Sequence, residues 1–292
     1  KDLMKFVKRT DFHTGGIICG RDGIKDAYST GRGKVILRAK AAIERQKGNK
    51  DTIVITEIPY QVNKANLITS IADLVQNKSV DGITDIRDES DKDGIRIVIE
   101  LRRDVEPQIV LNYLYKHTQL ETTFGIINLA LVHNTPRVLN LRQLMAEYIV
   151  HRREVIRRRT QFDLDRALKR AHILEGLRIA IDAIDEIIQT IRKSKTTPEA
   201  KTSLMKKFKL SDLQAQAILE MQLQRLTALE RSKIEEEYKA LQEDIKHYRA
   251  ILASEKMVDD IIKEELAMLK EKHGDDRRTE IAATAEEIEV ED

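Results

Sequence analysis

The densest group of residues that could do chemistry is a basic run at 151–159, His-Arg-Arg-Glu-Val-Ile-Arg-Arg-Arg. On a helix, Arg152 and Arg159 lie nearly in line, and so do Arg153 and Arg157, so the run would present more than one basic face. Such faces can contact phosphates or steer a polyanion. The alternative is a solvated helix face with charge pairs along the same helix, and the run taken alone favours it.

A second basic segment is Gly31-Arg32-Gly33-Lys34, followed by Arg38. Glycines let backbone N–H groups approach phosphates closely, so this segment could contact a phosphate. A hairpin turn that enters a strand explains it about as well. It is not a nucleotide-binding loop, because the patterns GxGxxG and GxxxxGKS/T are both absent from the sequence.

The sequence brings together no set of residues for metal binding or covalent catalysis. Its seven histidines are scattered and Cys19 is the single cysteine, which leaves neither a ligand cluster nor an internal disulfide. Residues 87–94 resemble a calcium loop only loosely and lack its final glutamate, so a turn between strands is expected. We therefore predict no catalytic residue, no metal site and no cofactor within the chain.

The composition is typical of long solvated helices. Charged residues make up 34% of the chain and aromatic residues 4%, and tryptophan is absent. The formal net charge of +2 argues neither for nor against a nucleic-acid partner. Any surface that binds nucleic acid must therefore come from local clusters of basic residues. No apolar run approaches the length of a membrane span, and a single cysteine fits a reducing compartment. We expect a cytoplasmic protein without a membrane partner.

Residues up to about 136 have a mixed α/β pattern. Runs of β-branched residues at 53–55, 83–86 and 95–101 are bounded by turn formers and predict strands. Asn63 can cap one helix, and Pro107 suits the first turn of another. We expect an α+β domain with a sheet of four or five short strands.

The rest of the chain is predicted to be a helical arm. A nearly unbroken helix is available from Leu141 to Arg192, and a return helix runs from about 229 to 252, with a further helix to about 273. In the outgoing helix and in the return helix from 229 to 252, apolar residues recur at gaps of three and four. This spacing places each set on one stripe of its helix, as in a coiled coil. The segment between them is short, so the arm is expected to be antiparallel. The two stripes are Leu174, Leu177, Ile181, Ile184, Ile188 and Ile191, and Ile234, Tyr238, Leu241, Ile245, Tyr248 and Leu252.

Several strings occur in the order in which the A-type chain of bacterial DNA gyrase has them, and together they cover nearly the whole chain. They are TGGII (14–18), GR (20–21), YSTGRGK (28–34), EIPYQVNK (57–64), RDESD (87–91), QAQAIL (214–219) and QRLT (224–227). On these residues the chain resembles that family of type II topoisomerases, and the A-type chain of topoisomerase IV is the nearest rival. Residues 9–14 depart from the family pattern by lacking two prolines, which predicts a looser loop there.

The resemblance implies a tower domain that flanks the cleaved DNA, an antiparallel coiled coil and a small helical tip where two copies of the chain meet at an exit gate. The implied boundaries are 1–138 for the tower, 139–198 for the outgoing helix, 199–228 for the tip, 229–278 for the returning helices and 279–292 for an acidic linker tail rather than a folded element. The catalytic tyrosine of the family is expected before residue 1, so the isolated chain is predicted to be inactive.

The resemblance also implies partners. The gyrase-like enzyme passes one DNA duplex through a transient double-strand break in another, driven by ATP, and thereby supercoils DNA negatively. ATP and Mg²⁺ belong to the B-type chain of an A2B2 assembly, the gyrase B subunit, in the bacterial cytoplasm and associated with the nucleoid.

The resemblance shifts the interpretation of individual residues. The predicted contacts with double-stranded DNA are Arg32, Lys34, Arg38, Lys64, Arg152, Arg153 and Arg157. The predicted residues of the homodimeric gate are Leu213, Ala217, Ile218, Met221 and Leu223, of which about half are expected to pack within their own chain instead. A structural coiled-coil scaffold without DNA function stays open as an alternative, although it would leave the α/β part without a role.

Overall fold

A computed structural model of the chain describes residues 2–7, 10–46, 50–221 and 228–282. The chain divides into two compact units, one formed by Lys1–Tyr148 with Asp275–Asp292 and the other by Ile149–Gly274. The first unit combines sheets and helices, and the second is helical. The protein is therefore α+β, with one long helix, α5, that begins in the first unit and continues through the second.

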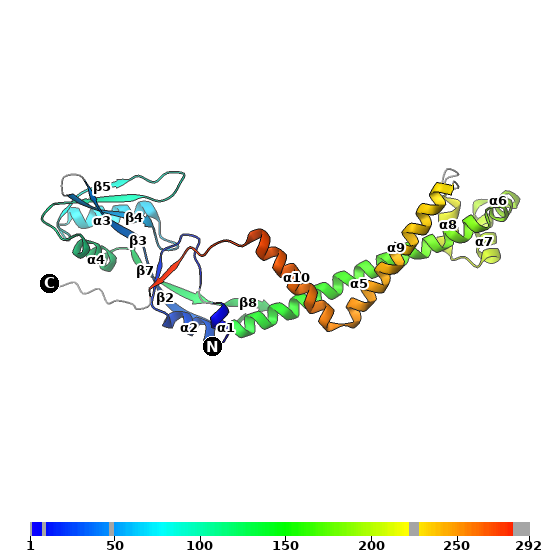
Figure 1. Ribbon diagram of the computed structural model, residues 1–292, viewed down its shortest axis with the longest axis horizontal. Helices are drawn as coiled ribbons and strands as arrows, with labels where there is room; N and C mark the ends of the chain where they lie inside the picture. Colours follow the sequence, from blue (N-terminus) through cyan, green and yellow to red (C-terminus); the bar gives the residue numbers. More distant parts are fainter. Residues whose placement is uncertain (1, 8–9, 47–49, 222–227, 283–292) are drawn as a thin grey trace. The chain divides into compact units, whose positions relative to one another are not determined.

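The strands described in the first unit form two four-stranded sheets and a hairpin (Figure 1). The first sheet has the order β10-β1-β2-β7, the second has the order β3-β4-β6-β5, and the hairpin is β8-β9. The strands are β1 (Ile17–Cys19), β2 (Arg32–Arg38), β3 (Lys40–Gln46), β4 (Lys50–Glu57), β5 (Ile83–Asp88), β6 (Ile97–Leu101), β7 (Glu121–Ile127), β8 (Leu129–Val132), β9 (Thr135–Val138) and β10 (Glu280–Ala282). The prediction of one sheet with four or five strands was wrong. Its β-branched runs identified strands of the second sheet only, because strands of the first sheet such as β2 carry many polar residues.

Two helices, whose first residues the sequence predicts, pack against the second sheet and form an apolar core with it. The helices described in this unit are α1 (Leu3–Phe6), α2 (Asp22–Thr30), α3 (Lys64–Gln76) and α4 (Pro107–His117). The Asn63 side chain accepts a hydrogen bond from the backbone N–H of Asn66 and caps α3, and Pro107 occupies the first turn of α4. Leu67 of α3 and Leu114 of α4 are both fully buried in one apolar cluster with the inward residues of β4 and β6.

Residues 279–282 are folded, which corrects the prediction of a linker there. β10 pairs in parallel with β1, and the backbone N–H of Glu280 donates to the Gly16 carbonyl (2.9 Å). The buried Thr279 hydroxyl accepts from the backbone N–H of Phe12 (2.8 Å), and the backbone N–H of Thr279 donates to Asp11 (2.9 Å). The acidic composition pointed to a linker, but strand pairing satisfies the backbone regardless of side-chain charge.

Two of these bonds reach Asp11 and Phe12, which lie in the segment 9–14 where a looser loop is predicted. Residue 9, the first of that predicted loop, and residues 283–292 of the predicted linker lie outside the described residues.

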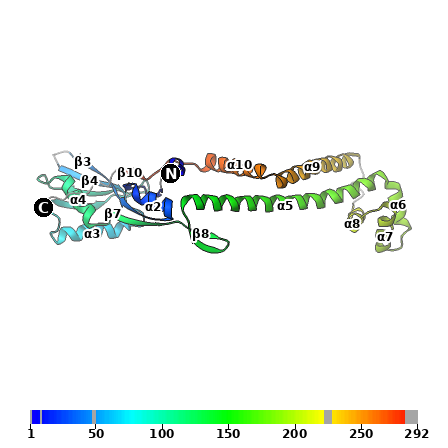
Figure 2. The same cartoon turned by 90° about the horizontal axis from the view of Figure 1, so that it is seen from below.

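The described residues of the second unit form one long helix, three shorter helices and two that return along the long one (Figure 2). The helices described there are α5 (Leu141–Asp182), α6 (Ile184–Lys193), α7 (Thr197–Phe208), α8 (Asp212–Leu219), α9 (Ala228–Ala253) and α10 (Glu255–His273). The expected return helices correspond to α9 and α10, which meet at Ser254, whose side chain caps α10. None of these described helices, nor any in the first unit, is long and apolar enough to cross a membrane.

The outgoing helix is broken at Ala183, within the stretch to Arg192 for which the sequence predicts a nearly unbroken helix. The backbone of Ala183 leaves the helical region (φ −119°, ψ 39°), and α6 begins at the next residue. Beyond this break Ile187 is the buried residue, whereas the predicted seam residues Ile184 and Ile188 are half-buried. Ile187 packs in one cluster with Leu204 of α7, so tertiary packing overrides the helix propensity of the segment.

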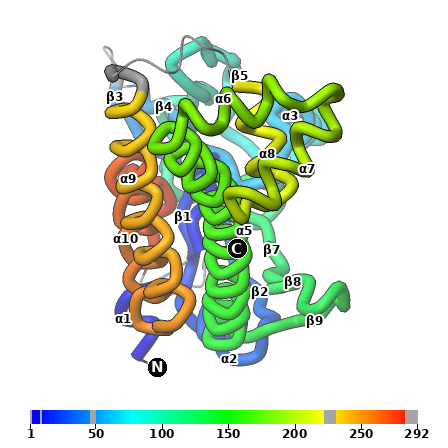
Figure 3. The backbone as a smooth tube through the Cα atoms, turned by 90° about the vertical axis from the view of Figure 1, so that its right-hand side faces the viewer, coloured from blue at the N-terminus to red at the C-terminus, as the bar shows by residue number. Residues whose placement is uncertain are grey.

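The helices α9 and α10 run antiparallel to α5. Along α5 the residue numbers of the paired arginines fall, whereas the numbers of their partners on α9 and α10 rise. The pairs are Arg178 with Glu235, Arg170 with Glu237 and Arg157 with Glu255. Apolar clusters follow the same order, with Ile156 and Val258 in one, Leu164 and Ile245 in the next, and Leu174 and Ile234 in the third. The helices α6, α7 and α8 lie together (Figure 3). The apolar stripe predicted on the return helix lies in these clusters, with Ile234 and Ile245 buried.

Candidate nucleic-acid interface

The outer face of β2 presents two exposed basic side chains. Side chains alternate along a strand, so Arg32 and Lys34 lie opposite Val35 and Leu37, which are buried beside α2. No ion pair of either basic residue is found within the described residues. Lys34 faces Gly125 across the sheet, and a side chain added at Gly125 would meet nothing within 4 Å. The surface beside Lys34 is therefore open to a large anionic partner.

The two glycines of this segment serve packing rather than phosphate approach. Gly31 ends α2 with a positive φ of 86°, a conformation that glycine adopts without strain. A Cβ at Gly33 would lie 2.1 Å from the Gly23 carbonyl oxygen, so glycine is required for α2 to pack on β2. The segment is thus a helix end followed by a strand, and not a hairpin turn.

Arg38 is held within the protein. Its Nε donates to Glu121 at 2.6 Å and its guanidinium lies 4.9 Å from the centre of the Tyr115 ring. Burial raises the pKa of Tyr115 to about 12, and the Tyr115 hydroxyl donates to the Ala39 carbonyl (3.1 Å). A phosphate that contacted Arg38 would have to compete with the adjacent Glu121 carboxylate.

Lys64 is also paired, at the start of α3. Its Nζ lies 2.7 Å from Asp88, and this contact, with bonds from Ser90, lowers the pKa of Asp88 to about 2. Asp88 therefore stays ionised and keeps Lys64 engaged at neutral pH. Of the four DNA contacts predicted in this unit, Arg38 and Lys64 have acidic partners, whereas Arg32 and Lys34 have none among the described residues.

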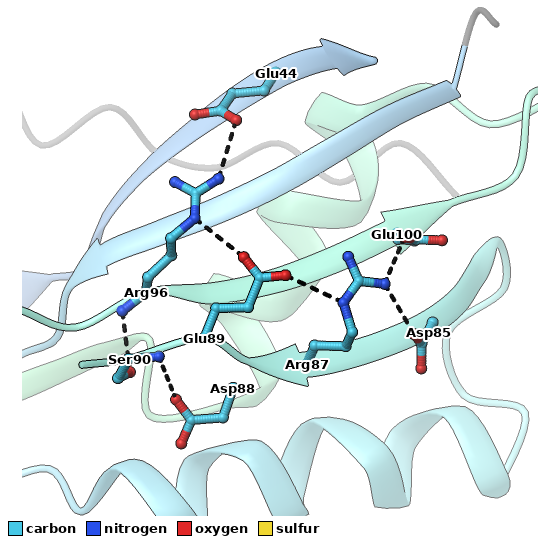
Figure 4. Close-up of polar contacts among 8 residues, drawn as sticks. All are labelled: Glu44, Asp85, Arg87, Asp88, Glu89, Ser90, Arg96 and Glu100. Carbon is cyan, nitrogen blue, oxygen red and sulfur yellow. Dashed lines mark hydrogen bonds and ion pairs between the residues drawn. The ribbon is translucent and has the colours of Figure 1, made fainter. Parts of the chain in front are cut away.

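A charged network that was not predicted from the sequence covers one face of the second sheet (Figure 4). Arg87 contacts Glu100 (2.6 Å), Asp85 (3.1 Å) and Glu89 (3.2 Å). Arg96 contacts Glu89 (3.2 Å) and Glu44 (3.4 Å). Two guanidinium groups here meet four carboxylates, so this face repels phosphate. The signal was present in the alternation of charges along β5 and just beyond it, where Asp85, Arg87 and Glu89 are two residues apart.

The basic run on α5 is neutralised by α10. Arg153 makes two hydrogen bonds to Asp259, both 2.7 Å long, and Arg157 contacts Glu255 at 3.3 Å. Arg152 and Arg159 share Glu265. These pairs join two helices. The pairing along one helix that the sequence favours is seen between Arg158 and Glu154 (3.7 Å). The three predicted DNA contacts in this run thus have acidic partners.

The predicted gate residues differ in their exposure. Leu213 is 62% exposed, and Ala217 and Met221 are half-buried. Ile218 is 3% exposed and lies in the apolar cluster of its own chain, and Ala217 and Met221 pack against the same cluster. Ile218 lies four residues after the buried Gln214, so both occupy the covered side of α8. Leu223 lies outside the described residues.

Among the described residues, no group of three or more His, Cys, Asp or Glu side chains could hold a metal ion. The acidic turn at 88–94 connects two strands, and in it Asp88 and Asp91 accept hydrogen bonds from the backbone N–H groups of Ser90 and Asp93. Cys19 is free and buried, and burial raises the pKa of its thiol.

Comparison with known proteins shows the family of the chain. The family model that describes the A subunit of DNA gyrase and topoisomerase IV matches residues 1–267. The chain is 57% identical over 291 residues to the DNA gyrase A subunit of Clostridium acetobutylicum, covering 100% of this chain and 35% of that protein. It is 56% identical to the DNA gyrase A subunit of Halalkalibacterium halodurans and 50% identical to that of Staphylococcus aureus strain MRSA252, again over 100% of this chain and 35% and 33% of those proteins.

The chain therefore belongs to the family formed by the A subunits of DNA gyrase and topoisomerase IV. It spans about a third of the length of these relatives.

The Arg153–Asp259 pair predicts how the contact between α5 and α10 responds to acid. The hydrogen bonds from Arg153 lower the pKa of Asp259 below its ordinary value of 3.8. The contribution of the Arg153–Asp259 pair to the stability of the folded state is therefore complete above pH 3.8, the ordinary pKa of the carboxyl group. It is lost as the pH falls through the lower pKa that Asp259 has in the folded state. We expect Arg153→Gln to move the titration midpoint of Asp259, measured by carboxyl carbon NMR, up toward 3.8.

Arg158→Gln is the matched control, because Arg158 is 70% exposed and pairs with Glu154 of its own helix. It should leave the Asp259 midpoint where it is. Equal midpoints in the wild type and in Arg153→Gln would show that the pair between Arg153 and Asp259 does not form in solution.

Proposed function

We propose that this chain is part of the A subunit of a bacterial DNA gyrase, where it contributes a contact with duplex DNA and a self-association surface. The observation that carries the proposal is the identity of 50–57% to proteins named as DNA gyrase A subunits over the whole chain. Within that proposal the first unit is the tower, α5 with α9 and α10 is the coiled coil, and α6 to α8 belong to the exit-gate tip. The assembly is an A2B2 complex in the bacterial cytoplasm, near the nucleoid, with ATP and Mg²⁺ on the B subunit.

The contact with DNA is assigned to the outer face of β2. Arg32 and Lys34 are two residues apart on an antiparallel strand and point the same way, so both can reach one phosphate backbone. Neither has an ion pair with another described residue, whereas Arg38, Lys64 and the α5 arginines already have acidic partners that compete with a phosphate. We keep those five residues as weaker candidates and place Arg32 and Lys34 first.

We expect Arg32→Ala/Lys34→Ala to weaken binding of the chain to duplex DNA about tenfold at moderate salt, because two phosphate contacts are lost. The same loss should reduce the slope of log affinity against log salt by about 2. Fluorescence anisotropy with a labelled duplex, repeated at several salt concentrations, measures both quantities.

The control removes two exposed charges elsewhere on the same unit, by Arg103→Ala/Lys116→Ala. If the control weakens binding as much as the β2 variant, net charge rather than a defined surface accounts for the affinity. If the wild type shows no salt-dependent binding at all, the scaffold alternative gains support over the topoisomerase.

The self-association surface is assigned to the exposed side of α8. Leu213 is exposed, and the half-buried Ala217 and Met221 are the next two candidates, ahead of the buried Ile218. A gate that must open and close needs an interface of ordinary size with a polar rim, and α8 carries the exposed acidic residues Asp212 and Glu220 at its two ends. Two copies would use the same patch about a two-fold axis.

We expect the chain to dimerise at tens of micromolar and Leu213→Asp to weaken the dimer at least about tenfold, because a charge would be desolvated in an apolar contact. Sedimentation velocity over a concentration series measures this. Met268→Asp on α10 is the matched control, since Met268 is also 62% exposed. A wild type that stays monomeric, or equal effects of the two variants, would contradict the assignment.

The A-type chain of topoisomerase IV is the second candidate, because the matching family model covers both enzymes. The relatives named above are gyrase chains, which favours gyrase. Within either enzyme we propose that the isolated chain binds DNA without cleaving it.

A further inference from the structure

Helix α8 is attached to α5 through one buried polar side chain, that of Gln214. Gln214 is 5% exposed, and its Nε2 donates to the backbone carbonyl of His172 at 2.8 Å. Its Oε1 accepts from the backbone N–H of Ser211 at 2.9 Å and so completes the capping box that begins α8. One amide group therefore ties the start of α8 to the side of α5.

A glycine on α5 makes this approach possible. A Cβ at Gly176 would lie 2.7 Å from both Cβ and Cγ of Gln214, closer than atoms can pack. Gly176 stands within a long helix, where glycine is less favourable than alanine. The close passage of Gln214 gives this otherwise unfavourable residue a structural reason.

The side chain of His172 makes a second contact at the same place. Its Nε2 lies 2.7 Å from the Ser211 hydroxyl, which in turn accepts from the backbone N–H of Gln214 (3.2 Å). His172, Ser211 and Gln214 thus form a polar joint between α5 and α8. Around it Leu174, Leu177, Ala215 and Ile218 form an apolar cluster.

Apolar contacts in such a cluster are non-directional and permit several orientations of a short helix. Hydrogen bonds in an apolar environment permit few orientations of the helix, because a displaced amide group would be buried without a hydrogen-bond partner. The residue next to Gln214 is Leu213, which is 62% exposed. The joint therefore fixes the direction in which Leu213 is presented.

We propose that Gln214, admitted by Gly176, is a positioning residue that locks α8 on α5 and so preorganises the surface through which two chains associate. The inference rests on the proposed self-association surface. If α8 were free to move, association would have to order it first, and this ordering weakens binding.

The test compares Gln214→Leu with Gln216→Leu in the full 292-residue chain. Both changes replace a glutamine of α8, but the Gln216 side chain donates to Glu220 on the surface of the same helix. We expect Gln214→Leu to weaken the dimer about tenfold in sedimentation velocity, and to speed amide hydrogen exchange of α8 about tenfold. Exchange in α9 and α10 should be unchanged, and Gln216→Leu should behave as the wild type in both measurements.

Gly176→Ala provides an independent variant that keeps every polar group and the capping box. Its added Cβ should push Gln214 away and produce the same two changes, so the proposal remains testable if Gln214→Leu fails to fold. Wild-type exchange and dimerisation in both variants would overturn the proposal. Faster exchange of α8 with an unchanged dissociation constant would overturn it too, because the joint would then be structural only.

Leu213→Asp separates this proposal from the proposed function. If Leu213→Asp leaves the dimer intact, the association surface is wrongly assigned, and the claim that Gln214 prepares that surface falls with it. If Leu213→Asp weakens the dimer while Gln214→Leu and Gly176→Ala do not, the surface stands and the positioning role of Gln214 is rejected.

Discussion

The second unit depends on the pairing of α5 with the two helices that return along it. The described residues of this unit form no sheet, so the apolar stripe of α5 is covered by α9, α10 and the three short helices. Exposed ion pairs contribute little stability individually. The pairs between Arg170 and Glu237, and between Arg153 and Asp259, use two guanidinium nitrogens each, which adds geometric specificity to apolar packing that is otherwise non-directional.

The same pairing determines which basic residues remain available. The arginines of the α5 run are occupied by carboxylates of α10, so the run that dominates the sequence is the less suitable surface for DNA. On β2, by contrast, Arg32 and Lys34 lie on the strand face opposite the one that α2 covers. The density of positive charge in a sequence is therefore a weaker guide than the partners that the fold gives to each charge.

The sequence was sufficient for the elements with local signals. Asn63 and Pro107 begin helices where they were expected to, and the apolar spacing from Ile234 to Leu252 is covered as predicted. What escaped prediction depends on residues distant in the chain. β10 forms because its backbone can pair with the edge of β1. The break at Ala183 is followed by residues that pack against α7. The ion pair of Arg38 requires Glu121, which lies on another strand. Spacing along one helix or strand contains no information on such partners.

Distances between spin labels test the antiparallel pairing of α5 with α9 and α10 most directly. With Cys19 replaced, labels are placed at the surface pairs Arg170/Glu237 and Arg157/Glu255 in two separate double-cysteine variants. We predict short distances in both variants, as for labels on helices whose axes are about 8–10 Å apart. A short distance in one variant and a long one in the other, or long distances in both, would contradict the pairing.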